Sequence, residues 1–119
     1  MPVVPTEIRL NKAERVLHVV FDDGSAFALP AEYLRIESPS AEVQGHSPDQ
    51  KQIVPGKRQV AITAIEPVGN YAVRLIFDDR HDTGIYSWEY LLELGREQGK
   101  RWPAYLAALE VRGMNRDRA

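Results

Sequence analysis

The chain has 119 residues, of which 44% are hydrophobic and 27% are charged, and its formal net charge is -2. This length suits one domain, residues 1–119, and so small a charge gives no overall attraction for nucleic acid or an anionic membrane. The absence of cysteine excludes disulfides, thiolate zinc sites, cysteine-ligated iron–sulfur clusters and cysteine nucleophiles within the chain. The first ten residues lack the apolar region of a signal peptide, and no apolar run reaches the length of a membrane span. We therefore expect a cytoplasmic protein with no nucleic-acid or membrane partner.

The first third of the chain predicts three short strands and a short helix. Alternating apolar positions rich in β-branched and aromatic residues favour strands over helices. The three strands are expected at residues 7–11, 16–21 and 26–29. Asp23-Gly24 fits the tight turn of a hairpin between the second and third strands, and Pro30 suits the first turn of a helix that reaches Arg35.

Residues 38–56 change character, because serine, glycine and proline there interrupt any regular element. We expect a long loop, and a loop of this length in a compact domain is usually functional or mobile. Strand alternation resumes in two further segments. These are residues 60–66 and 71–77.

The remaining residues predict two C-terminal helices and a tail. Ser87 is a plausible N-cap for a first helix that buries Trp88 and Leu91, and Gly95 is a plausible stop. A second helix is expected from Trp102 to Val111, with Pro103 in its first turn and with an apolar stripe. The stripe consists of Tyr105, Leu106 and Leu109. Residues 113–119 are expected to form a frayed polar tail.

These elements predict one α+β domain, a mainly antiparallel sheet of about six short strands with two C-terminal helices packed against it. An internal similarity supports this arrangement. Val19–Asp23 resembles Leu75–Asp79, and Glu32–Leu34 resembles Glu89–Leu91 at nearly the same separation. Two similar units, each a β-hairpin followed by a helix, are therefore predicted to share one core.

The densest group of ionisable side chains follows the strand that ends at Phe77, in the segment Asp78-Asp79-Arg80-His81-Asp82. His81 with Asp79 and Asp82 offers ligands for a divalent cation, and His46 in the long loop is free to approach them. The alternative is that His81 fixes the turn through a hydrogen bond, while the aspartates form turns and caps.

Four further residues are candidates for contact with a protein partner. Tyr90 and Trp102 are expected to be partly exposed, and aromatic residues dominate interface hot spots. Lys57 and Arg58, with other basic residues, form a possible basic rim for an anion or an acidic partner. The alternatives are that the aromatic rings pack in the core and that the charges are simply solvated.

An ordered set of motifs resembles a known family. The motifs are Leu34-Arg35-x-x-Ser38-Pro39-Ser40-Ala41-Glu42-Val43, Pro55-Gly56-Lys57-Arg58, Glu66-Pro67-Val68-Gly69-Asn70-Tyr71, and Phe77-Asp78-Asp79-x-His81-x-x-Gly84-x-Tyr86-Ser87-Trp88-x-x-Leu91. Together they resemble the gamma-butyrobetaine hydroxylase-like N-terminal domain, from Pro5 to about Gly99. In the hydroxylases this domain is an accessory module ahead of an iron- and 2-oxoglutarate-dependent catalytic domain. Small stand-alone bacterial members have unknown function, and related domains are attached to P-loop iron–sulfur carrier proteins.

The resemblance implies a zinc site made of three cysteines and a histidine. It places Ser38, Ser40 and Val43 at the cysteine positions and His81 at the position of the histidine. A serine hydroxyl is a poor zinc ligand beside a thiolate, and valine has no lone pair to donate. The resemblance therefore implies a degenerate zinc site, and no cofactor is expected.

Three functions remain open. Motifs for nucleotide binding, metalloprotease chemistry and serine hydrolases are absent, so no catalytic residue is assigned. The preferred hypothesis is a non-catalytic binding or adaptor module with a protein partner, accessory to a redox or iron–sulfur enzyme. The second is a protein that binds zinc or another divalent cation. The third is a small oxidoreductase-related enzyme, which rests on the family resemblance alone.

Overall fold

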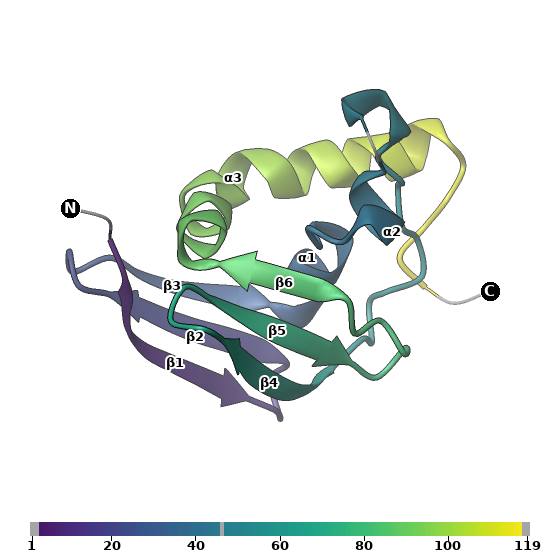
Figure 1. The fold of residues 1–119 in the computed structure, drawn as a ribbon. Helices are drawn as coiled ribbons and strands as arrows, with labels where there is room; N and C mark the ends of the chain where they lie inside the picture. Colours follow the sequence, from purple (N-terminus) through teal and green to yellow (C-terminus); the bar gives the residue numbers. More distant parts are fainter. Residues whose placement is uncertain (1–2, 46, 118–119) are drawn as a thin grey trace.

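The structure is a computed structural model that describes residues 3–45 and 47–117 (Figure 1). It contains six strands, three short helical segments and one long helix. The strands are β1 (Pro5–Asn11), β2 (Val16–Phe21), β3 (Ala26–Pro30), β4 (Ile62–Val68), β5 (Ala72–Phe77) and β6 (Gly84–Ser87). The helices are α1 (Ala31–Ile36), α2 (Ala41–Gln44), the 3-10 turn η1 (Pro48–Gln50) and α3 (Trp88–Val111). No helix in the described part of the chain combines the length and apolar character needed to cross a membrane.

The strands form two antiparallel sheets of three strands each, in the orders β1-β2-β3 and β4-β5-β6. Alternate residues of the two central strands point inward and are buried, as a half-buried strand requires. The core joins these side chains to α1 and α3, and α3 runs along the side of the molecule where β3 and β6 lie (Figure 1). The predicted α+β class and the six short antiparallel strands are confirmed, although the strands form two sheets and not one.

The internal similarity in the sequence corresponds to a repeated three-dimensional unit. Each half of the chain is a three-stranded meander followed by a helix, β1-β2-β3-α1 and β4-β5-β6-α3. The turns after the two central strands make equivalent bonds, since Asp22 N–H donates to the Val4 carbonyl and Asp78 N–H to the Ala61 carbonyl, both at 2.9 Å. The two aspartate side chains accept in return from the backbone N–H groups of Val4 and Ala61.

A reciprocal pair of tyrosine hydrogen bonds joins the two units. Tyr33 on α1 donates its hydroxyl to the Leu94 carbonyl at 2.7 Å. Tyr90, its counterpart on α3, donates to the Glu37 carbonyl at 2.6 Å. Each tyrosine thus bonds to the residue four positions after the other, which is the relation expected of two units facing each other across an approximate two-fold axis.

A single C-terminal helix replaces the two that were predicted. α3 continues through Gly95 and Gly99, and Pro103 lies in its interior. Gly95 lies within the helix and makes room for a neighbour. A Cβ atom at this position would lie 2.5 Å from the ring of Phe27 on β3. Within this helix Leu91 is buried as predicted, but Trp88 is only half-buried.

Two segments expected to be irregular are more ordered than the sequence suggested. Residues 38–56 contain α2 and η1. The tail is held by its backbone, since Gly56 N–H donates to the Asn115 carbonyl and Arg58 N–H to the Arg116 carbonyl, both at 3.0 Å. The Arg116 guanidinium also makes two hydrogen bonds to the buried Glu32 carboxylate, at 2.6 and 2.7 Å. Up to residue 117, the tail is therefore tied to the rest of the protein by hydrogen bonds.

Candidate functional site

His81 occupies the turn between β5 and β6 and is 4% exposed. Its Nε2 atom lies 2.8 Å from the Ser38 hydroxyl, and its Nδ1 atom lies 2.9 Å from an Oε2 carboxylate oxygen of Glu42. An ionised carboxylate can only accept a hydrogen bond, so Nδ1 carries the proton and, in the neutral ring, Nε2 accepts from Ser38. The turn is shaped for this arrangement by Arg80, which has a left-handed backbone with φ of 71°.

Further hydroxyl groups extend this network. Ser40 Oγ lies 2.7 Å from Thr83 Oγ1, which also lies 3.0 Å from the Glu42 carboxylate. The backbone N–H of Ser40 donates to Ser38 Oγ at 3.2 Å. We call the five residues Ser38, Ser40, Glu42, His81 and Thr83 the His81 network.

The His81 network contains three of the four positions that the family resemblance assigns to zinc ligands. The fourth, Val43, lies on α2 and is buried. The serine side chains offer neutral hydroxyls that are already hydrogen-bonded, and valine offers no donor atom. This set does not fit a tetrahedral zinc site, which requires thiolate or imidazole ligands.

Burial is the main influence on the protonation of His81. It lowers the pKa of this imidazole below the ordinary histidine value, and the nearby Arg35 guanidinium lowers the pKa further. The carboxylates of Glu42 and Asp79 act in the opposite direction but do not prevail. Neutral His81 is therefore the favoured form, in agreement with its hydrogen bonds.

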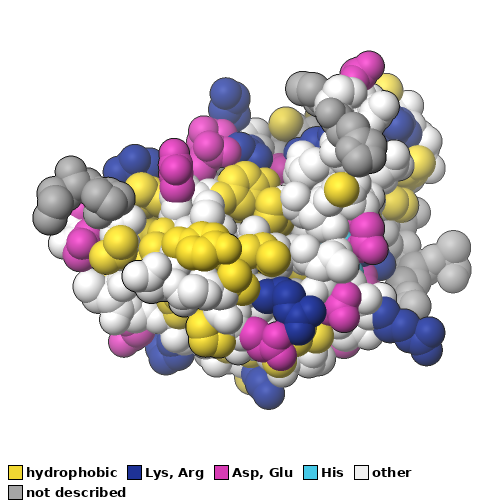
Figure 2. Space-filling view, viewed as in Figure 1, with side chains coloured by type: hydrophobic (Ala, Val, Ile, Leu, Met, Phe, Trp, Pro, Cys, Tyr) yellow, Lys and Arg dark blue, Asp and Glu magenta, His cyan; other side chains and the backbone are white. Residues whose placement is uncertain are grey.

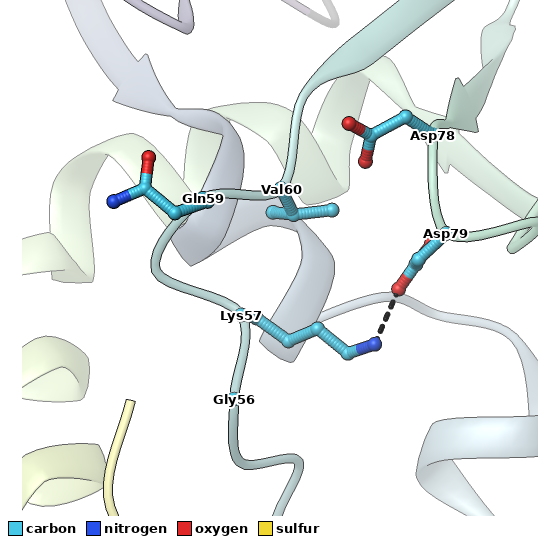
Figure 3. A pocket seen from close by; sticks show the side chains of 6 residues that line it. All are labelled: Gly56, Lys57, Gln59, Val60, Asp78 and Asp79. Atoms are coloured by element: carbon cyan, nitrogen blue, oxygen red, sulfur yellow. Dashed lines mark ion pairs between the residues drawn. The ribbon is translucent and has the colours of Figure 1, made fainter. Parts of the chain in front are cut away.

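Asp79 forms the second cluster of charges at this turn. Its Oδ2 atom lies 2.8 Å from the Arg35 Nε atom and 2.7 Å from the Lys57 Nζ atom. Burial acts to raise the pKa of Asp79, but hydrogen bonds from Lys57 and Arg35 outweigh it, so the pKa lies below the ordinary value. Figure 3 shows Lys57 reaching Asp79 across a small cavity of about 130 Å³ that Asp78 and Gln59 also line.

The predicted metal ligands that the structure describes, Asp79, His81 and Asp82, do not assemble into a coordination site. Asp79 is bound to two cations, and Asp82 is exposed, with its backbone carbonyl accepting a bond from Arg74. His46 lies outside the described residues. Among residues 3–45 and 47–117, no three histidine, aspartate or glutamate side chains are placed to hold a metal ion.

Ser38, His81 and Glu42 follow the order of a serine, histidine and acid triad. In a hydrolase the serine oxygen attacks a substrate carbonyl, so it must be reached from solvent. Ser38 is 0% exposed, and a Cβ atom on Gly84 would lie only 2.7 Å from its oxygen. The geometry therefore suits a structural hydrogen-bond network around the buried Ser38 and His81, and not nucleophilic catalysis.

The four candidate partner-binding residues are all engaged within the protein. Tyr90 is half-buried and bonded to Glu37. Trp102 is half-buried too, and it packs against Tyr33 and Tyr105 with the Arg116 guanidinium over its ring. Lys57 is paired with Asp79, as described above, and Arg58 is paired with Asp117.

A groove of about 710 Å³ lies elsewhere, at the beginning of α3. Its walls are mainly apolar and come from the N-terminal segment, from the turn between β4 and β5, and from α3. They include Val3, Val4, Tyr71, Trp88 and Leu92, with Glu89 and Arg96 also lining the groove. Figure 2 shows hydrophobic side chains gathered over β6 and the beginning of α3. We call this feature the Tyr71 groove.

Sequence reasoning missed Tyr71, which belongs to the inward-facing series Val73, Leu75 and Phe77. By alternation it should be buried, yet 58% of it is exposed. It lies one residue before β5 begins, at the end of the sheet. The only sequence signal was its position beside the turn Pro67–Asn70.

The two sheets, the long helix and the His81 network define a small α+β module with no assembled catalytic centre among its described residues. The sequence matches the family described as gamma-butyrobetaine hydroxylase-like, N-terminal, over residues 8–92. The chain belongs to this family, as its motifs indicated.

Solved structures support the same assignment. Two proteins known from NMR solution structures are 43% and 46% identical to this chain, and both have a TM-score of 0.83. The matches cover 96% and 97% of this chain and 90% and 86% of the respective relatives. A crystal structure from Acidithiobacillus ferrooxidans, of a protein of unknown function in the DUF971 family, is 44% identical with a TM-score of 0.65. That match covers 76% of this chain and 91% of the relative. No curated protein matches the chain.

Proposed function

We propose that this chain is a non-catalytic, cytoplasmic binding module that docks a protein partner in the Tyr71 groove. The observation that carries the proposal is the exposure of Tyr71, 58%, beside the half-buried Trp88 in a largely apolar groove. Aromatic side chains that line such a groove, with an arginine such as Arg96 also lining it, have the composition of an interface hot spot. The hydrogen bond from Trp88 Nε1 to the Asn70 carbonyl, at 2.8 Å, fixes the orientation of the indole before a partner arrives.

The His81 network supports a structural role for the turn between β5 and β6. We infer that the family's zinc site is degenerate here, because two of its positions carry hydroxyls and one carries valine. Hydrogen bonds among these side chains hold α2 against the turn in place of a metal. On the family resemblance, we propose that the partner is a redox or iron–sulfur enzyme to which this module is accessory.

The proposal is tested by capture of partners on the protein at native expression levels. Tyr71→Ala removes the exposed ring of the groove, so we expect it to lose the specific partner that the unaltered protein retains. Met114→Ala is the matched control, since Met114 is 39% exposed and lies in the tail, outside the groove lining. Capture of the same partner by both variants, or the recovery of no partner by the unaltered protein, would contradict the proposal.

A further inference from the structure

The second half of α3 exposes a largely apolar face in the described structure. Tyr105 and Leu109 point into the core, whereas the residues on the other side of the helix are exposed. We call these exposed residues the outer face of α3. They are Gly99, Lys100, Pro103, Ala104, Leu106, Ala107, Glu110 and Val111. Val111 is 87% exposed and Leu106 is 38% exposed, although the sequence placed Leu106 in the buried stripe with Tyr105 and Leu109.

The outer face has a self-complementary distribution of charge. A basic residue, Lys100, stands at one end and an acidic residue, Glu110, at the other, with only apolar or small residues on the face between them. Neither forms an ion pair with another residue of the described ranges. When two such faces pack antiparallel, Lys100 of each copy lies near Glu110 of the other, so opposite charges meet at two places.

We propose that two copies of this chain associate through the outer faces of their α3 helices, packed antiparallel about a two-fold axis at the level of Tyr105. The axis places Lys100 of each copy opposite Glu110 of the other. A two-fold interface uses the same patch on both copies, so every contact occurs twice. Burial of the apolar residues between the charges supplies the driving force.

The same register matches large side chains with small ones. It places Pro103 of each copy over Ala107 of the other, near the centre of the interface. A Cβ atom on Gly99 would meet no neighbouring atom within 4 Å, so the helix surface is open at this position. Small residues allow two helices to approach closely, and alternation of large and small side chains is how helix surfaces interlock.

The register is tested by charge reversal. Light scattering or sedimentation, over about 10 µM to about 1 mM protein, covers the range in which modest interfaces associate. We expect the unaltered protein to reach twice the monomer mass of 13.5 kDa. Lys100→Glu alone and Glu110→Lys alone each place like charges together twice, and each should weaken dimerisation about tenfold. The double variant K100E/E110K restores opposite charges and should restore the dimer.

Lys12→Glu, in the turn between β1 and β2, is the matched control and should leave association unchanged. Circular dichroism checks that each variant remains folded. A monomer throughout the concentration range would overturn the proposal. So would a dimer that tolerates both single reversals, and failure of the double variant to recover would overturn the register.

Discussion

At His81, hydrogen bonds occupy both nitrogens of a buried imidazole, one to the Ser38 hydroxyl and one to the Glu42 carboxylate. A buried polar group that loses its partner costs about 1–3 kcal/mol, whereas a satisfied one contributes only about 1 kcal/mol. The network therefore acts mainly by specifying one arrangement of α2 against the turn between β5 and β6. Its members support one another, so removal of one should loosen the rest.

The fold should lose stability in mild acid because of His81. Its folded pKa lies below the ordinary value of 6.5, so the unfolded chain takes up the proton more readily. The free energy of unfolding is then greatest above pH 6.5 and falls as the pH drops through the lower, folded pKa. Denaturant titrations across this pH range measure how steeply the free energy of unfolding depends on pH. His81→Gln should flatten this dependence, and an equal slope in this variant and the unaltered protein would contradict the assignment.

Purified, tag-free protein should contain little zinc, iron or manganese, less than about a tenth of an equivalent of each, because the His81 network lacks thiolate ligands. Elemental analysis measures the content, and thermal melting with and without a chelator measures its effect. We expect the same melting temperature in both conditions. A stoichiometric metal whose removal unfolds the protein would show that the hydroxyls and His81 do coordinate a cation.

The candidate site was predictable in part. Family motifs brought Ser38, Ser40 and His81 together, and the geometry shows them in one network. Glu42 and Thr83 were missed as members, because nothing in local spacing indicates that a residue of the loop meets one 41 positions away. Lys57 is predicted to lie in a solvated or partner-binding rim, but it binds Asp79 together with Arg35, a pairing that depends on the tertiary fold.

Among the elements, α3 shows why glycine is an ambiguous signal. Glycine often follows the last turn of a helix, and this was the reason to end a helix at Gly95. Here the Phe27 ring occupies the space a side chain would need, so the residue is glycine for packing and not for helix termination. The strands were predictable because alternation reports directly on one buried face, whereas a glycine in a helix has several explanations that only packing separates.

Gly95 lies on the packed side of α3 and Gly99 on its exposed side, so substitution by alanine should have opposite effects at the two positions. Gly95→Ala pushes a methyl group into the Phe27 ring and should lower the free energy of unfolding by about 1–3 kcal/mol, the usual cost of overpacking. Gly99→Ala meets no neighbour and should raise it by about 0.5–1 kcal/mol through helix propensity. Denaturant unfolding of both variants measures the difference. Equal effects would mean that the ring moves aside.

Over the whole molecule, the two halves are joined by contacts between residues far apart in sequence. The reciprocal bonds of Tyr33 and Tyr90 link the two meander-and-helix units near their shared core. The tail adds a second link, since Arg116 reaches back to the buried Glu32 of α1. The repeat was visible in the sequence as two short similar segments. The link made by the tail was not visible, because the polar composition of the tail is typical of frayed ends.

Arg116→Ala should destabilise the whole domain, because it leaves the Glu32 carboxylate, whose side chain is 8% exposed, without its partner. We expect a loss of about 1–3 kcal/mol in the free energy of unfolding. Asp117→Ala is the control in the same tail. It breaks an exposed pair with Arg58 and should change stability by less than about 1 kcal/mol. Similar losses in the two variants would indicate that the tail stabilises through its backbone alone.

Pro103 interrupts the backbone hydrogen bonds of α3, although the helix continues on both sides of it. A proline has no N–H group, so the carbonyl four residues earlier, that of Gly99, cannot receive the usual hydrogen bond from position 103. On the N-terminal side of this gap the helix rests on Phe27, Tyr33 and the sheets, and beyond it the helix is tied through Tyr105 to the Val54 carbonyl. Amide protons beyond Pro103 can therefore exchange with solvent by a local opening that leaves the first half of the helix protected.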